Sequence, residues 1–115
     1  MQIDETILPA VLVDYWKLLR SYERSASDLP DGKAEKIQAQ IRYSSNRLEQ
    51  LTREADIRLV CFDDEEYSPE LPVTAINAED LAGVAETMVE RTIEPTLLSQ
   101  GKVIHTGKVL LKGAS

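Results

Sequence analysis

The sequence predicts an α+β protein in which an N-terminal helical hairpin is followed by a small all-β C-terminal domain. Up to about residue 55, apolar residues recur at three- and four-residue spacing, which is the period of an amphipathic helix. From Ile57 onward, short runs alternate apolar and other residues and are separated by turns that contain Gly or Pro. This change of period predicts a helical part over residues 1–56 and a β domain over residues 57–115.

The first helix is expected from Ile7 to Tyr22. Thr6 can cap it, and Pro9 falls in the first turn, where the missing amide costs no hydrogen bond. Its apolar positions at helical spacing are Leu8, Val11, Leu12, Tyr15, Leu18, Leu19 and Tyr22. Further apolar residues that widen this surface are Ala10, Val13 and Trp16. The width predicts burial on two sides, as in a helix bundle.

The second helix is expected over residues 33–55, after a cluster of turn-forming residues at 25–32. Its apolar seam alternates between spacings of four and three, and consists of Ile37, Ile41, Ser44, Leu48, Leu51 and Ala55. Two such hairpins would make a four-helix bundle in a homodimer, whereas the alternative is a seam that packs only within one chain. The residues expected at the dimer interface are Leu12, Trp16, Leu19, Ile37, Ile41, Leu48 and Leu51.

The β domain begins with short segments that are rich in strand-forming residues. The expected strands are 57–62, 85–94, 102–105 and 108–111, with a short helical turn at 78–82. The segment 77–92 fits both a helical and a strand period, and Gly83 favours the strand. Residues 63–66 form a charged loop. Calcium loops place their ligands at alternate positions around a glycine, and no glycine follows here, so we expect this loop to be solvated and not to bind a metal ion.

Composition limits the possible partners and compartment. A net charge of −7 argues against nucleic acid, an anionic membrane surface or another acidic partner. The N-terminus lacks the features of a signal peptide, and no apolar run approaches the roughly 20 residues of a membrane span, so a cytoplasmic location is expected. The single cysteine, Cys61, excludes an internal disulfide and is expected to be a buried structural thiol.

Residues suited to catalysis or metal binding are few. The one histidine, His105, lies in a strand region without a nucleophile motif, and is expected at a strand edge or on the surface. Zinc sites need several Cys or His ligands, and no Gly-rich loop is present to cradle a phosphate. The sequence therefore predicts a protein that is not an enzyme and has no metal or cofactor. The competing hypothesis is a small enzyme that uses His105 with an acidic residue.

The run from Thr92 to Leu111 resembles the C-terminal signature of the GrpE family, the nucleotide exchange factors of DnaK-type chaperones. The matching positions are Gln100-Gly101-Lys102-Val103-Ile104 and Val109-x-Leu111. The departures are Thr96-Leu97 in place of Gly-aromatic, His105 in place of Arg, Gly107 in place of Ala or Ser, and Pro72 in place of His. Upstream, Ile7-Leu8-Pro9 is similar to the segment that opens a helix in that family, and residues 47–60 are similar to its second bundle helix and first strand. The family's long N-terminal stalk helix has no counterpart before Ile7.

The resemblance implies a homodimeric co-chaperone of protein folding and the stress response. In that family the β domain contacts the ATPase domain of the chaperone and promotes nucleotide release. The partner-binding residues that it implies here are Tyr67, Pro69, Ile93, Lys102 and Leu111. Taken alone, these residues also fit plainer roles: core residues, a solvated lysine, a loop anchor and a turn former. The motif departures support an alternative, a GrpE-like dimeric adaptor with a different protein partner and no exchange activity.

Overall fold

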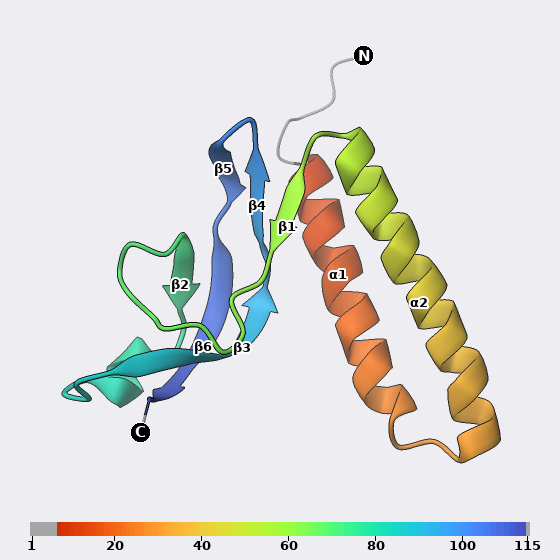
Figure 1. Cartoon of the computed structure of the whole chain (residues 1–115), viewed down its shortest axis with the longest axis horizontal. Coiled ribbons are helices and arrows are strands. Elements are labelled where there is room, and N and C mark those ends of the chain that lie inside the picture. The colour runs from red at the N-terminus through yellow and green to blue at the C-terminus, as the bar shows by residue number, and fades with distance from the viewer. Residues whose placement is uncertain (1–6, 115) are drawn as a thin grey trace. The chain divides into compact units, whose positions relative to one another are not determined.

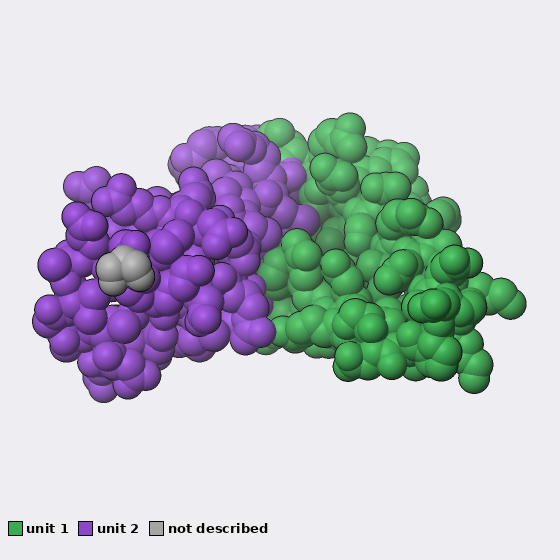
Figure 2. Space-filling view, turned by 60° about the horizontal axis from the view of Figure 1, so that its bottom comes forward, with its two compact units in different colours: residues 1–56 green, residues 57–115 purple. Residues whose placement is uncertain are grey.

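The computed structural model describes residues 7–114 of the chain. The chain divides into two compact units, residues 1–56 and 57–115 (Figure 2). Two helices occupy the first unit, and the second contains two three-stranded sheets (Figure 1). The predicted α+β class, a helical hairpin followed by a small β domain, is confirmed.

The helical unit is an antiparallel pair, α1 (Ile7–Ala26) and α2 (Asp31–Glu54). α1 continues four residues past its expected end, and the connecting loop is correspondingly short. Thr6, the expected cap of α1, lies outside the described residues. Pro30 precedes α2 with no side-chain cap, and Asp31 instead places a carboxylate in the first turn, where the helix dipole favours negative charge.

Polar contacts supplement the apolar contact between α1 and α2. The Tyr15 hydroxyl donates a long hydrogen bond of 3.5 Å to the backbone carbonyl of Ser44. On α1, the Arg20 guanidinium lies 5.0 Å from the centroid of the Trp16 ring, a cation–π distance. The residues of the two helices that are buried in the chain are Pro9, Leu12, Val13, Trp16, Ala26, Ile41, Leu48 and Thr52.

The first sheet of the β unit has the order β1-β4-β5 and is antiparallel throughout. Its strands are β1 (Arg58–Val60), β4 (Thr96–Ser99) and β5 (Lys102–His105). Gln100 and Gly101 connect β4 to β5 with φ values of 52° and 75°, which is the left-handed backbone that a tight two-residue hairpin turn requires. A register shift between Leu97 and Leu98 makes a bulge in this hairpin.

The second sheet has the order β2-β6-β3. Its strands are β2 (Val73–Ala75), β6 (Gly107–Gly113) and β3 (Thr87–Glu94). β6 lies in the centre, parallel to β2 and antiparallel to β3. The charged segment before β2 extends the sheet, because the Asp64 N–H bonds to the Val89 carbonyl at 2.9 Å and the Tyr67 N–H to the Thr87 carbonyl at 3.0 Å.

The core of the β unit lies on this second sheet. Its buried members are Phe62, Val89, Val109 and Leu111. Val109 and Leu111 alternate along β6, so both side chains project from the same face. The partly buried residues packed against this cluster are Val60, Tyr67, Leu71, Val73, Ala75 and Leu81. The residues that form this cluster therefore come from four strands, one 3₁₀ helix and the segment between β1 and β2.

Thr96 ties three segments of the β unit together. Its buried hydroxyl donates to the Pro72 carbonyl at 2.7 Å and accepts from the Gly107 N–H at 3.1 Å. Gly107 is needed for this close approach, since a Cβ there would lie 2.6 Å from the Glu94 carbonyl oxygen and 2.9 Å from the Thr96 nitrogen. Two positions that depart from the GrpE signature, Thr96 and Gly107, thus form one structural contact.

Several expected elements appear with shifted ends, and two were not expected. The strands expected at 57–62, 85–94 and 108–111 are β1, β3 and β6, while β5 has the expected bounds. The helical turn expected at 78–82 is a 3₁₀ helix, η1 (Ala78–Leu81). β2 and β4 were missed because each has at most four residues and neither alternates clearly. Cys61, expected to be buried, is only partly buried, because it precedes a turn rather than continuing a strand.

Candidate partner-binding surfaces

The turn between β4 and β5 presents a basic residue beside two exposed aliphatic residues. Lys102 is exposed at the start of β5, and Val103 and Ile104 follow it with 46% and 39% of their surface exposed. Two features leave these side chains uncovered: β5 is an edge strand, paired with β4 alone, and the bulge leaves Ile104 without a cross-strand partner. We call residues 100–104 the β4–β5 tip.

The five residues implied by the resemblance are not brought together on one surface. Lys102 belongs to the first sheet, whereas Ile93 and Leu111 lie on β3 and β6 of the second. Leu111 is only 5% exposed and is part of the core, so it offers no surface to a partner. Tyr67 is partly buried against the same core, and Pro69 is exposed in the loop before β2. Lys102 is therefore the best placed of the five for a contact.

His105 lies beside a carboxylate that also has a lysine close to it. Its Nε2 is 3.1 Å from Oε1 of Glu94, and the Lys108 Nζ is 3.9 Å from the other oxygen of the same carboxylate. The Glu94 side chain is only 12% exposed, and a carboxylate in that position needs such partners to offset its desolvation. These contacts join the ends of β3 and β5 to the start of β6. His105 lies at the end of the edge strand β5, which agrees with the strand-edge position expected from the sequence, and its contact with Glu94 gives it a structural role there.

The acidic loop of residues 63–66 also has structural contacts. The Asp63 carboxylate accepts a hydrogen bond from the Thr92 N–H at 3.0 Å, and the Thr92 hydroxyl accepts one from the Phe62 N–H at 3.0 Å. Asp64 Oδ1 lies 3.9 Å from the Lys112 Nζ. Across residues 7–114, no group of three or more His, Cys, Asp or Glu side chains is arranged to hold a metal ion.

A second candidate surface is an exposed apolar stripe on α1, formed by Ile7, Val11, Leu18 and Tyr22. Their spacing of four, seven and four residues puts them on one face of the helix. Leu18 is 68% exposed, the highest value among the four. The two-sided burial expected for this helix is therefore met on only one side within the single chain. The sequence indicates a wide apolar surface on this helix, but it does not show which of the apolar residues remain exposed.

The residues expected at a dimer interface fall into two groups. Those that are buried within the single chain are Leu12, Trp16, Ile41 and Leu48. Leu19 and Ile37 are partly buried, and Leu51 is exposed. The four buried residues could contact a second chain only if the chain that contains them rearranged to expose them. In this conformation, a dimer would instead use the α1 stripe.

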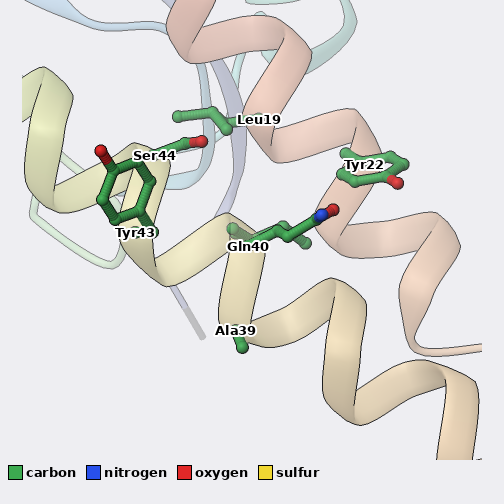
Figure 3. A pocket seen from close by; sticks show the side chains of 7 residues that line it. Leu19, Tyr22, Ala39, Gln40, Tyr43 and Ser44 are labelled. Carbon is green, nitrogen blue, oxygen red and sulfur yellow. The ribbon is translucent and has the colours of Figure 1, made fainter.

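An open groove of about 460 Å³ lies between α1 and α2 (Figure 3). The residues that line it are Leu19, Tyr22, Ala39, Gln40, Ile41, Tyr43 and Ser44. The Gln40 side chain extends from α2 toward α1, and Tyr22 borders both the groove and the α1 stripe. The groove therefore continues the exposed apolar surface of α1 toward α2.

Comparison with protein-family profiles, curated protein sequences and solved structures gives no match. None of the described helices is both long enough and apolar enough to cross a membrane.

Proposed function

We propose that the chain is a GrpE-like co-chaperone that binds the ATPase domain of a DnaK-type chaperone and promotes nucleotide release. The observation that carries this proposal is the exposure of Lys102, Val103 and Ile104 at the β4–β5 tip. These residues belong to the part of the sequence that resembles the GrpE signature, and the basic residue lies directly after the turn. A cytoplasmic location belongs to the same proposal.

Such a protein acts by binding two conformations of its partner unequally. A ligand that prefers the open form of a nucleotide cleft lowers the affinity for nucleotide, because the coupling between two ligands is reciprocal. No chemical step by the exchange factor is needed. Lys102 suits this role, since an ammonium group on a flexible stem can follow a moving carboxylate without the fixed geometry of a guanidinium.

The test is the release of a fluorescent nucleotide from a DnaK-type chaperone, with the wild-type chain and with Lys102→Ala. Lys36→Ala, which removes the same charge from an exposed position on α2, is the matched control. We expect the wild type and the control to accelerate release equally, and the Lys102 variant to accelerate it less. A folded wild-type chain that leaves the release rate unchanged would exclude exchange activity toward that chaperone.

The departures from the GrpE signature at Thr96, Leu97, His105 and Pro72 favour a second candidate function, a GrpE-like dimeric adaptor that binds a different protein and has no exchange activity, and the α1 stripe offers a surface for its dimer. Four exposed apolar residues on one helix face form a contiguous apolar patch, which is typical of an interaction site. A second copy of the chain would cover this patch. Homodimerisation belongs to both candidate functions, so the nucleotide-release assay is what separates them.

A further inference from the structure

Strand register places a second basic residue at the same end of the sheet as Lys102. Arg58, the first residue of β1, is opposite Leu98, and Ser99 is opposite Lys102. In Figure 1 the start of β1 and the β4–β5 turn lie at one end of the sheet. Adjacent strands are about 4.8 Å apart, so the backbones of Arg58 and Lys102 lie roughly 10 Å apart, on the two outer strands.

The local charge at this end is opposite to the charge of the chain. The chain carries −7 overall, yet none of the residues of β1, β4 and β5 is Asp or Glu. Among residues 7–114, neither Arg58 nor Lys102 forms an ion pair. Glu94 precedes the far end of β4 and is held by His105 and Lys108. The nearest carboxylate before Arg58 along the chain is Asp56, outside the strands.

Exposed apolar side chains lie beside the two cations. Leu98, partly buried, is between Arg58 and Val103 in one cross-strand row, so these three side chains share a face of the sheet. Lys102 precedes Val103 along β5 and therefore projects from the opposite face. Arg58 therefore shares its face with the aliphatic residues Leu98 and Val103, and Lys102 lies at the same end of the sheet on the opposite face, so a segment that contacts both cations has to cross this end of the sheet.

We infer that this end of the sheet binds an acidic protein segment whose carboxylates pair with Arg58 and Lys102 while its apolar side chains cover Leu98 and Val103. The inference depends on the proposed function only for the identity of the partner, a carboxylate-bearing surface of the chaperone ATPase domain. The net charge of the chain disfavours acidic partners in general. The charged residues are unevenly distributed, however, and this end of the sheet is a local basic site that an acidic segment can bind. Arg58 becomes a contact that the resemblance does not include.

The first experiment measures binding of the full chain to the chaperone ATPase domain by titration calorimetry. Arg58→Glu and Lys102→Glu should each weaken binding by about tenfold or more, because a repulsive charge replaces an attractive one at the contact. Arg91→Glu is the matched control, since Arg91 is exposed on β3 of the other sheet and the variant has the same net charge. The control should bind within about twofold of the wild type.

The second experiment needs no chaperone and separates the two proposals. A short peptide of alternating glutamate and leucine is titrated into the isotope-labelled chain and followed by amide chemical shifts. We expect shifts at residues 58, 98 and 100–103 that disappear in Arg58→Glu and persist in Arg91→Glu. Peptide binding without chaperone binding would reject the exchange-factor proposal and keep this one. Shifts elsewhere, no shifts, or equal weakening by the control would overturn the acidic site, even if exchange activity is present.

Discussion

The side-chain amide of Asn77 binds both backbone groups of Leu111. Its Nδ2 donates to the Leu111 carbonyl at 2.9 Å, and its Oδ1 accepts from the Leu111 N–H at 2.8 Å. β2 ends at Ala75, and the Ile76 N–H bonds to the Val109 carbonyl at 3.0 Å. The Asn77 side chain therefore replaces the backbone of a strand and continues the pairing with β6 after β2 has turned away.

The variant Asn77→Ala should destabilise the β unit by about 1–3 kcal/mol, because it leaves both backbone groups of Leu111 without their partner. Chemical denaturation followed by circular dichroism measures this loss. Asn46→Ala is the control: Asn46 is exposed on α2, where alanine is the better helix former, so its stability should be unchanged or slightly higher. Equal losses in the two variants would contradict the role given to Asn77.

The variant Gly107→Ala should be more damaging than its size suggests. The added methyl would meet the Glu94 carbonyl oxygen and the Thr96 nitrogen at 2.6 and 2.9 Å, and backbone atoms cannot rotate away. We expect a loss of about 1–3 kcal/mol or more. Gly32→Ala is the control, since nothing lies within 4 Å of its Cβ position in α2, and a gain of about 0.5–1 kcal/mol is expected. Thermal melts of the two variants should move in opposite directions.

The variant Thr96→Val keeps the shape of the side chain and removes its hydroxyl. The Pro72 carbonyl and the Gly107 N–H both lose a hydrogen bond, for an expected cost of about 1–3 kcal/mol. Faster hydrogen exchange of the Gly107 amide should accompany this loss. Thr106→Val, at an exposed neighbouring position, should change stability by less than about 0.5 kcal/mol. A Thr96 variant as stable as this control would show that the hydroxyl is dispensable.

The α1 stripe makes a prediction about oligomeric state. Light scattering should give the wild type a mass well above the 12.9 kDa of one chain, and Leu18→Glu should return it to that mass. Asn46→Glu introduces the same charge at an exposed position of α2, away from the stripe, and should keep the higher mass. A wild type that stays at the mass of one chain over a wide range of concentrations would remove the stripe as a dimer surface.

Helix positions could be predicted from the sequence because the signal is local. Apolar spacing identified both helices, and the breaker cluster located the loop between them. The helical period also showed that α1 is apolar on more than one side. It could not divide that surface into a buried part with Leu12 and Trp16 and an exposed part with Leu18, because the division depends on which neighbours are present.

The contacts of the β unit depend on residues that are distant in sequence. Asn77 fits the start of a helix locally, but the structure shows no side-chain cap there and a partner 34 residues away. Arg58 is a single basic residue that belongs to no recognisable motif. Only its register with Leu98 places it at the same end of the sheet as Lys102. A single sequence carries no direct signal for such pairings.

The central position of β6 in its sheet has a consequence for synthesis of the protein. β2 and β3 each pair with β6 and not with each other, so both lack this central strand until residues 107–113 have been made, and until then β3 can pair only with the segment 64–67. The ribosome therefore releases a helical hairpin that can already pair its helices, followed by strands that must wait. During that interval the aliphatic residues of β2 and β3 are exposed to other unfolded chains, and slower elongation before residue 107 should lower the yield of folded protein.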